Sequence, residues 1–266
     1  MKKGVVYAVT SGKGGVGKTT TTANLSTGLA MLGKKVAVVD ADIGLRNLDI
    51  VMGLENRVVF NLVDVIEGKA KLKMALIKDR QFKDNLQLLP AAQTRDKDAV
   101  TPDDMIKLAK ELSKDFDYVF IDSPAGIENG FKNAVAGADE VIIVTNPEVS
   151  AVRDADRIIG VLEASQKNKP KLIINRIKPN MVKKGEMLSV EDVLELLGID
   201  LYGVVPDDES IISSSNKGEP VIKYADAKAG QAYLNITKRI TGEQIPLLDL
   251  DDKKGILNKI SNLFKK

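Results

Sequence analysis

Six short apolar runs rich in valine and isoleucine constrain the fold of this chain more than any other feature. Each run is hydrophobic at successive positions, as expected of strands buried on both faces of a parallel sheet. The runs span residues 5–10, 36–40, 118–122, 140–145, 171–175 and 201–205. Helices are predicted between them at 20–32, 102–113, 150–166, 190–197 and 229–240. This alternation predicts an α/β fold, a doubly wound and mainly parallel sheet flanked by helices.

Two residue types are missing from the 266 residues, because the chain contains no Cys and no His. Disulfides, thiolate or imidazole metal sites and Ser–His or Cys–His nucleophiles are therefore excluded. Any bound metal must be a hard cation held by oxygen ligands. We expect any general base to be a carboxylate or a lysine.

The charged residues nearly balance, with Lys+Arg 39 against Asp+Glu 37. A net charge of +2 gives no reason to expect nucleic-acid binding. No apolar run is long enough to span a bilayer, and the apolar run near the N-terminus is too short for a signal peptide. These features favour a cytoplasmic protein.

A glycine-rich loop follows the first predicted strand and precedes the first predicted helix. Residues 12–19 match G-x-x-x-x-G-K-[ST] in register. Glycines let backbone N–H groups turn toward phosphate oxygens, and the helix start favours an anion. Lys18 can reach the outer phosphates of a bound ligand, and the Thr19 hydroxyl can hold Mg²⁺. The alternative is a glycine-rich turn without a ligand.

Aspartates stand at the carboxyl ends of two predicted strands, where ligands bind in open α/β sheets. Asp122 is a candidate for the Mg²⁺ shell; alternatively Asp122 or Ser123 caps a helix or turn after Pro124. Asp40 and Asp42 lie two residues apart. If strand geometry persists, both side chains point to one face and serve one site. The alternative is a solvated loop pair.

The composition changes after residue 245. An acidic linker, 246–252, precedes KKGILNKISNLFKK, which carries five lysines and no acid. Residues 1–245 are predicted to form one domain and 253–266 an amphipathic helix. Its apolar stripe is Ile256, Leu257, Ile260, Leu263 and Phe264. Such a helix is typical of an anchor for anionic membrane lipids. The alternatives are a terminal helix docked on the core or one inserted into a partner's groove.

Lys13 is a second lysine, placed early in the loop. Residue type alone leaves open whether it is a solvated loop lysine or a functional one. Residues 12–20 resemble the deviant Walker A motif of the ParA/MinD family of ATPases. VDADIGLRNLDIVMG, IDSPAGIENG and SNKGEPVI extend the resemblance over nearly the whole chain. It implies a P-loop NTPase that hydrolyses ATP with Mg²⁺. It also implies an ATP-dependent homodimer in which Lys13 reaches the partner's nucleotide.

The resemblance also assigns roles to individual residues. Asn175 is implied to contact adenine through its amide, which can donate and accept; otherwise it is a turn residue. Lys13, Lys18 and Asp42 are implied to be catalytic, with Asp42 orienting the attacking water. The implied metal site is Thr19, Asp40 and Asp122. The implied ATP contacts are Gly12, Lys13, Gly14, Gly15, Val16, Gly17, Lys18, Thr19, Thr20, Asn175 and Pro206.

With the tail included, the chain resembles the septum-positioning branch of this family. That implies attachment to the cytoplasmic face of the inner membrane with ATP bound, recruitment of the septum inhibitor MinC, and release by a MinE-like activator where one is present. Asp154, within residues 148–156, is the implied partner contact; alternatively it pairs with Arg153 or Arg157. A ParA-like partitioning ATPase, a flagellar-number regulator and a non-hydrolysing nucleotide-binding scaffold remain alternatives.

Overall fold

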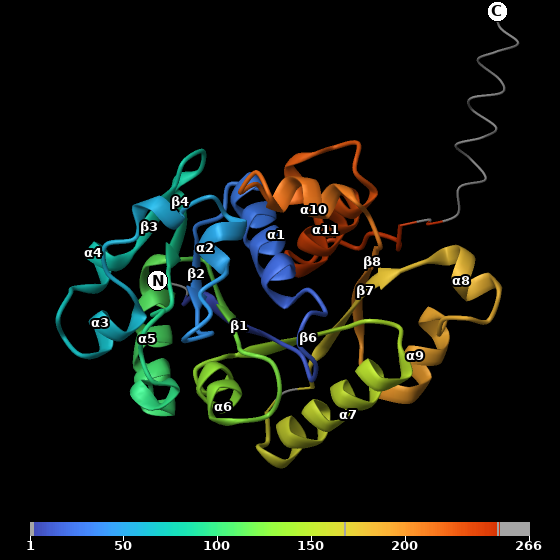
Figure 1. Ribbon diagram of the computed structural model, residues 1–266, viewed down its shortest axis with the longest axis horizontal. Helices are drawn as coiled ribbons and strands as arrows, with labels where there is room; N and C mark the ends of the chain where they lie inside the picture. The colour runs from blue at the N-terminus through green and yellow to red at the C-terminus, as the bar shows by residue number, and fades with distance from the viewer. Residues whose placement is uncertain (1–2, 168, 249, 251–266) are drawn as a thin grey trace, which may run out of the picture.

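One eight-stranded sheet organises the protein, seen in a computed structural model that describes residues 3–167, 169–248 and 250. Its order is β3-β4-β2-β5-β1-β6-β7-β8, and every neighbouring pair is parallel except β3 with β4 (Figure 1). The strands are β1 (Val5–Thr10), β2 (Val36–Asp40), β3 (Ile77–Asp79), β4 (Lys83–Leu89), β5 (Tyr118–Asp122), β6 (Glu140–Thr145), β7 (Lys171–Ile177) and β8 (Leu201–Pro206). The predicted doubly wound α/β fold is confirmed.

Helices flank the sheet and fill most of the connections. They are α1 (Lys18–Met31), α2 (Leu48–Val51), α3 (Leu62–Ile66), α4 (Leu72–Ala75), α5 (Pro102–Asp115), α6 (Asn129–Ala136), α7 (Val149–Ala164), α8 (Pro179–Lys183), α9 (Val190–Leu197), α10 (Ser210–Ser215) and α11 (Lys228–Ile240). Short 3₁₀ turns are η1 (Glu55–Arg57), η2 (Lys97–Ala99) and η3 (Val221–Lys223). Among the described residues, no helix combines the length and hydrophobicity needed to cross a membrane.

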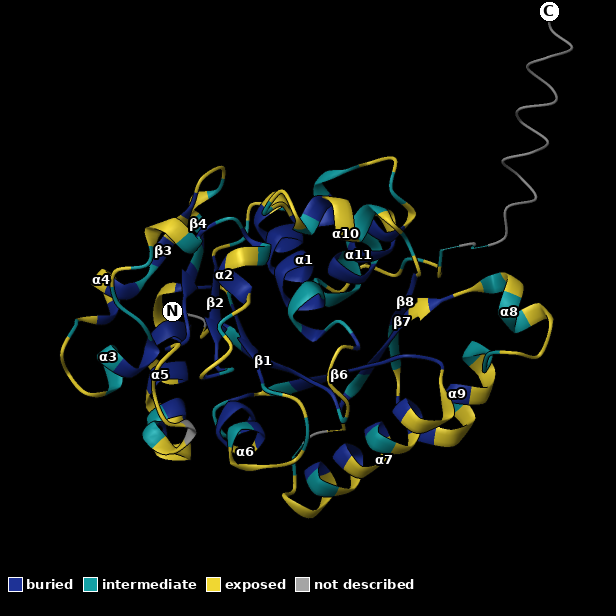
Figure 2. Cartoon of the chain, in the orientation of Figure 1, coloured by how far each residue is buried: buried dark blue, intermediate teal, exposed yellow. Residues whose placement is uncertain are grey.

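Two hydrophobic clusters pack on opposite faces of the sheet. On one face, α1 and α11 cover side chains such as Tyr7, Val38 and Phe120. On the other, α5, α6, α7 and α9 cover the alternate side chains, such as Val6 and Ile121. Fully burying one such side chain contributes roughly 1.5–3 kcal/mol. Because both faces are covered there, the central strands β2, β5, β1 and β6 consist mainly of buried apolar residues, and Figure 2 shows them buried while the helices expose only their outer sides.

The functional loops lie side by side because the parallel strands end at one edge of the sheet. Asp122 carbonyl oxygen accepts the Ala41 N–H at 2.9 Å, which joins the ends of β5 and β2. Ser123 N–H donates to the Val9 carbonyl at 3.1 Å, which joins the end of β5 to β1. The loops after β1, β2 and β5 therefore meet at this edge, as expected for an open α/β sheet.

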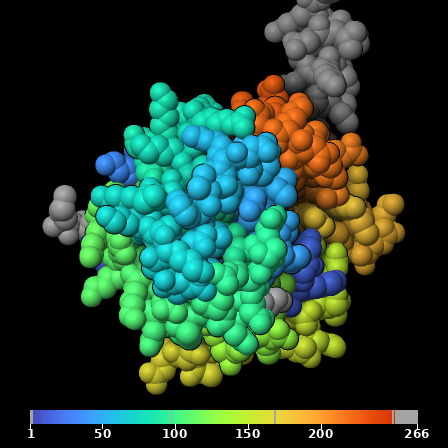
Figure 3. All heavy atoms as spheres, turned by 60° about the vertical axis from the view of Figure 1, so that its left-hand side comes forward, coloured from blue at the N-terminus to red at the C-terminus, as the bar shows by residue number. Residues whose placement is uncertain are grey.

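The sequence did not predict the elements that widen the sheet beyond β2. β4 begins with charged and polar residues and β3 is very short, so neither is a continuous apolar run. Figure 3 shows the segment from α2 to α5 as one continuous surface on this side of the molecule. β7 also runs two residues beyond its predicted end at 175, past a register shift between Ile174 and Ile177.

Residues 245 and 246, which follow α11, are attached to the edge of the sheet. The Arg239 guanidinium donates to the Tyr202 carbonyl at 2.8 Å, to Ile245 at 2.9 Å and to Pro246 at 2.7 Å. These bonds tie the region of the predicted boundary at 245 to β8. The predicted amphipathic helix, 253–266, lies outside the described residues.

Candidate nucleotide-binding site

The glycine-rich loop leads from β1 into α1 as a cradle of backbone groups. Gly15 and Gly17 have positive φ angles of 78° and 100°, a conformation that glycine adopts without a steric penalty. Gly17 is also the N-cap residue of α1, and no side chain caps the helix there. Glycines of the loop and the first residues of α1 line the adjoining cleft of about 450 Å³, and a helix N-terminus at a cleft suits an anion.

Lys18, Thr19 and Thr22 lie on the first turns of α1 beside the end of β5. Thr19 Oγ1 donates to Asp122 Oδ2 at 2.7 Å, and Thr22 Oγ1 donates to Asp122 Oδ1 at 3.1 Å. Lys18 is buried and lines the cleft. The alternative in which Asp122 or Ser123 caps a helix after Pro124 is wrong, because Asp122 belongs to β5 and the next helix begins at Asn129.

Asp40 and Asp42 differ sharply in their surroundings. Asp40 is buried, pairs with Asp122 across β2 and β5, and accepts N–H groups from Asp42 at 3.0 Å and Leu48 at 3.2 Å. β2 ends at Asp40, so the strand geometry on which the expected shared face depended does not persist to Asp42. Asp42 still lies near the buried pair, because its charge raises the pKa of both Asp40 and Asp122. Asp42 lines the cleft beside the glycine-rich loop, which we call the phosphate cleft.

Burial raises the pKa of the Asp40 carboxyl well above its usual range, and the neighbouring Asp122 carboxylate raises it further. Backbone N–H donors act in the opposite direction. Burial also raises the pKa of Asp122, against the Thr19 and Thr22 hydroxyls and the Lys18 charge. Two neighbouring buried carboxyl groups are difficult to ionise together. A bound cation would stabilise their charged forms. This oxygen-rich pair fits Mg²⁺.

Replacing Asp122 by asparagine is expected to raise the thermal midpoint of the nucleotide-free protein more at about pH 8 than at about pH 5. When folding raises the pKa of an acid, its ionised form is less favourable in the folded than in the unfolded protein. The folded protein therefore loses stability as pH rises from the usual carboxyl pKa of about 4 through the raised value. Asparagine resembles the neutral acid and avoids that penalty. Thermal unfolding of both proteins in EDTA at the two pH values measures the difference.

The matched control for this prediction is Asp200→Asn. Asp200 is exposed, and the Lys171 ammonium lowers its pKa, so its neutralisation brings no gain at high pH. An equal gain for Asp122→Asn at both pH values would contradict the prediction. The Asp122→Asn protein should also lose the Mg²⁺-dependent part of its stabilisation by ADP.

Lys13 projects from the loop toward the start of α7. Its Nζ atom lies 3.5 Å from Glu148 Oε2 and 3.4 Å from Ser150 Oγ. The Lys13 and Glu148 side chains are 45% and 51% exposed, so the ion pair contributes only about 0–1 kcal/mol. The lysine is therefore held only weakly within its own chain, and its role toward a partner's nucleotide stays a prediction.

Two asparagines fasten the loop to the neighbouring strands. Asn175 Nδ2 donates to the Val16 carbonyl at 2.7 Å, so this donor is directed at the loop and not at a base as predicted. Asn175 Oδ1 is buried and accepts no hydrogen bond from a described residue. Asn146, with its amide nitrogen turned inward, donates to the Asn175 and Val16 carbonyls at 3.3 Å.

Pro206 lies on β8, where it pairs with Ile177 at the end of β7. It lines a hollow of about 580 Å³ with Asp208, Tyr224 and Lys228 among its other walls. The predicted base contacts Asn175 and Pro206 therefore come from neighbouring strands. Whether either side chain contacts adenine stays a prediction.

Gly12 places the loop against α7. A Cβ atom there would lie 2.2 Å from the Asp154 carbonyl oxygen, so only glycine fits. The Asp154 side chain lies 3.6 Å from the Arg157 guanidinium, which is the salt bridge foreseen as the alternative to a partner contact. A partner contact at Asp154 stays a prediction. Gly14, Val16 and Thr20 complete the predicted loop contacts; Gly14 and Thr20 line the phosphate cleft and Val16 is buried.

Thr22 and Asn146 are site residues that sequence reasoning missed. Thr22 lies one helical turn after Thr19, so the i, i+3 spacing could have placed it beside Asp122. Asn146 directly follows β6, so the strand-end rule used for Asp122 applies to it too.

Comparison with known proteins extends this description. Residues 7–221 match the sequence profile of the CobQ/CobB/MinD/ParA nucleotide binding domain. The chain belongs to this family. The MinD/ParA match runs from β1 to η3 and includes the phosphate loop, both buried aspartates and Asn175.

Three relatives within the MinD/ParA family are similar over nearly their full lengths. The septum site-determining protein MinD of Bacillus subtilis is 54% identical over 263 residues, covering 98% of each protein. A chain of the MinC:MinD cell division protein complex of Aquifex aeolicus has a TM-score of 0.86 and 48% identity, covering 92% of this chain and 99% of that one. The septum site-determining protein MinD of Pyrococcus horikoshii, complexed with Mg-ADP, has a TM-score of 0.80 and 32% identity, covering 89% and 95%.

Proposed function

We propose that this protein is an ATPase that dimerises with ATP, attaches to the membrane and positions the division septum. In this proposal it recruits a MinC-like septum inhibitor on the cytoplasmic face of the inner membrane and leaves when ATP is hydrolysed. The observation that carries the proposal is the glycine-rich cleft, linked through Thr19 to the buried pair Asp40 and Asp122, with Lys13 exposed on the same loop. The names of the relatives favour septum positioning among the activities of the family.

The site fits ATP and Mg²⁺ in its charges and donors. Loop N–H groups and Lys18 suit the phosphates, and the Asn175 Oδ1 acceptor suits an amino group. Thr19 and Asp122, with Asp40 behind them, would hold Mg²⁺. The relative from Pyrococcus horikoshii was solved with Mg-ADP, which supports this choice. The bound cation would neutralise charge on the phosphates.

Three residues of this chain have separate roles in hydrolysis. Lys18 stabilises the charge that develops on the transferred phosphate, and Asp42 orients the attacking water and accepts its proton. Lys13 supplies a further cation from the partner subunit of the dimer, by the same physics as an arginine finger. Because that cation crosses between subunits, hydrolysis requires the dimer.

Membrane attachment is assigned to the tail. Each lysine near an anionic surface contributes about 1 kcal/mol, so one copy of 253–266 binds weakly. Two copies on one dimer gain roughly 10²–10⁴ in avidity without any new contact. ATP-dependent dimerisation therefore controls attachment to lipid. A MinE-like activator, where present, would act by speeding hydrolysis.

The MinC:MinD complex of Aquifex aeolicus supports a MinC-like partner for this chain. We place the contact on residues 148–156, with Asp154 at its centre. A ParA-like partitioning activity is not favoured, because the matching ParA family ATPase from Chlorobium tepidum is 21% identical and shares the fold alone.

The wild-type protein is expected to sediment with anionic vesicles in ATP and to stay in solution in ADP. Ile260→Glu should lower binding in ATP at least about tenfold, since one buried apolar side chain contributes roughly 1.5–3 kcal/mol. Its ATP-dependent dimerisation without lipid should be unchanged. Vesicle sedimentation and size-exclusion chromatography with ATP, with ADP and without nucleotide measure both properties.

Ile106→Glu is the matched control, because Ile106 is 44% exposed on α5 and receives the same substitution. It should bind vesicles like the wild type. Equal vesicle binding of the wild type in ATP and ADP, and of Ile260→Glu, would contradict the proposed membrane cycle.

A further inference from the structure

A small apolar cavity lies behind the phosphate cleft. It has a volume of about 20 Å³ and is enclosed by the loops after β2 and β5 together with side chains near α3, α5 and α6. Of the described residues, Asp42 and Pro124 alone line both this cavity and the phosphate cleft. These two residues therefore form the wall between them. The residues that pack against Asp42 and Pro124 on the cavity side therefore influence where these two residues lie in the phosphate cleft.

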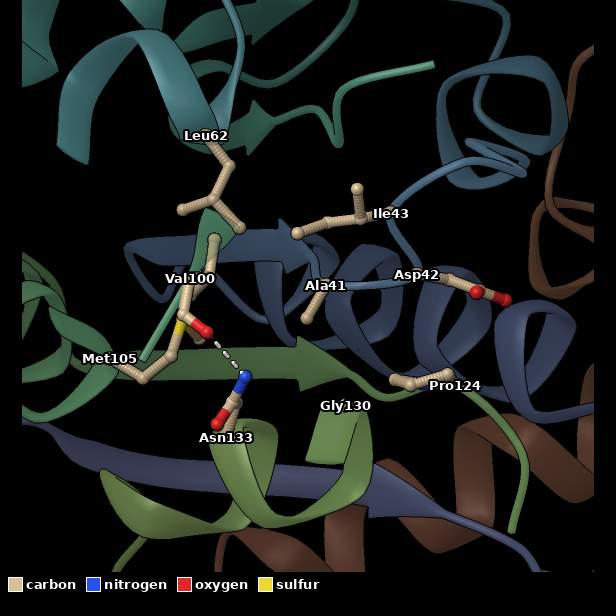
Figure 4. A pocket seen from close by; sticks show the side chains of 9 residues that line it. All are labelled: Ala41, Asp42, Ile43, Leu62, Val100, Met105, Pro124, Gly130 and Asn133. Atoms are coloured by element: carbon tan, nitrogen blue, oxygen red, sulfur yellow. Dashed lines mark hydrogen bonds between the residues drawn. The ribbon is translucent and has the colours of Figure 1, made fainter. Parts of the chain in front are cut away.

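Figure 4 shows how the wall is built. The Asp42 carboxylate points away from the other residues around the cavity, whereas the Ile43 side chain points toward them. Pro124 stands between Asp42 and the α6 helix, which carries Gly130 and Asn133. The position of Asp42 in the phosphate cleft thus depends on how Pro124 packs against α6.

Gly130 lets Pro124 sit directly on the helix. A Cβ atom at Gly130 would lie 2.5 Å from Pro124 Cγ and 3.5 Å from Cδ. Gly130 is not among the glycines with positive φ, so close packing is what requires a glycine here. The proline ring closes onto its own backbone nitrogen. A push on the ring therefore moves the main chain of residues 123–125.

That main chain connects the parts of the nucleotide site. Ser123, next to Asp122, donates its N–H to the Val9 carbonyl, and Gly126 N–H donates to the Ser11 carbonyl at 3.0 Å. A displaced Pro124 therefore shifts the end of β5 against the phosphate loop.

Asn133 prevents α6 from moving away instead. It lies almost one turn after Gly130 and is buried. Its Nδ2 atom donates to the Val100 carbonyl at 2.6 Å, which ties α6 to the segment before α5. With the helix held, an atom added at Gly130 acts on Pro124.

We propose that Gly130 is a positioning residue for ATP hydrolysis. By leaving out a side chain, it lets Pro124 settle on α6 and so sets the positions of Asp42 and Asp122 relative to the phosphate loop. This inference rests on the proposed ATPase function.

Steady-state phosphate release and binding of a non-hydrolysable ATP analogue test the proposal with Gly130→Ala. Its kcat should fall at least about tenfold, since a misplacement of about 1 Å can cost 10²-fold in rate. Its affinity for the analogue should stay within about threefold of the wild type, because the change acts on the reaction step and not on ground-state binding.

Gly160→Ala is the matched control. Gly160 is exposed on α7, and an added Cβ atom there meets nothing within 4 Å. The same substitution in a helix should therefore leave kcat unchanged and keep or raise the thermal midpoint.

Pro124→Ala tests the same contact from the other side. It removes the ring without crowding the helix, so it should lower kcat while analogue binding is kept. If Gly130 acts through Pro124, the double variant Gly130→Ala/Pro124→Ala has a kcat no lower than Pro124→Ala alone. This comparison also decides the question if Gly130→Ala alone does not fold.

Three results would overturn the role of Gly130: wild-type kcat in Gly130→Ala, wild-type kcat in Pro124→Ala, or losses that multiply in the double variant. Each of them leaves the ATPase function standing. A wild-type protein that releases no phosphate from ATP, even with anionic vesicles, overturns the proposed function and this inference with it.

Discussion

Replacing Lys13 by alanine is expected to lower the rate of ATP hydrolysis by at least about 10³-fold, because a cation supplied across an interface to a phosphoryl transition state contributes 10³–10⁵ in rate. The variant should also lose the ATP-dependent dimer, since the lysine would no longer contact the partner's nucleotide. Its binding of one ATP per subunit should persist, because Lys18 and the loop N–H groups remain.

The free energy of the contacts that Lys13 makes within its own chain is small compared with this effect. Among the described residues, the Lys13 ammonium group contacts Glu148 and Ser150, at 3.5 and 3.4 Å, and both charged side chains are about half exposed. Breaking such a pair costs about 0–1 kcal/mol. A rate contribution of 10³ corresponds to roughly 4 kcal/mol, so reaching the partner's phosphates outweighs the lost pair.

Phosphate release and size-exclusion chromatography with ATP measure the Lys13→Ala variant. Lys3→Ala is its matched control, because Lys3 is also an exposed lysine in an ion pair, at 3.3 Å from Asp139. It should hydrolyse ATP and dimerise like the wild type. A Lys13→Ala protein that keeps either activity would show that the lysine does not act across a dimer.

The central strands could be predicted from the sequence because burial on both faces leaves a continuous apolar run. β5 and β6 have the predicted bounds, since helices cover both of their sides. β4 was missed because four of its seven residues are charged or polar, and it pairs on one side only with the short β3. β3 and β4 therefore depend on tertiary pairing, which a local hydrophobic pattern does not encode.

The chemical identity of the site was more predictable than its geometry. The spacing of Gly12 to Thr19 requires a strand before and a helix after, and the structure has both. The contrast between Asp40 and Asp42 could not be predicted, because it arises from an N–H to carboxylate bond that turns the chain after β2. The packing of Pro124 on Gly130 could not be predicted either. It is a tertiary contact that exists because Gly130 has no side chain, and the sequence pattern does not show which atoms lie next to a glycine.

Replacing Asp42 by asparagine is expected to lower kcat by about 10²–10⁴-fold, the usual contribution of a positioned general base. Asparagine keeps the size and polarity of the side chain but cannot accept the proton of the attacking water. ATP binding and the ATP-dependent dimer should persist, because neither requires proton transfer. The variant should therefore stay on anionic vesicles after the wild type has hydrolysed its ATP and left.

Asp40→Asn is the contrasting variant, because Asp40 ends β2 only two residues before Asp42 and is buried, whereas Asp42 lines the cleft. Both carboxylate oxygens of Asp40 accept backbone N–H groups, from Asp42 and from Leu48, and an amide nitrogen at either place would face a donor. At about pH 5, where the raised pKa keeps the Asp40 carboxyl neutral and the folded state carries little ionisation penalty, that variant should lose thermal stability, since a buried donor left unsatisfied costs about 1–3 kcal/mol. Asp42→Asn, which lines the cleft, should keep its thermal midpoint.

The two variants together separate a chemical role from a structural one. Single-turnover phosphate release reports the reaction step, and thermal unfolding reports the fold. The expected pattern is a lost rate with an intact fold for Asp42→Asn, and a lower thermal midpoint for Asp40→Asn. Wild-type turnover in Asp42→Asn would remove Asp42 from the reaction, and a different group would then have to orient the water. Because the chain contains no histidine, that group would have to be another carboxylate or a lysine at the cleft.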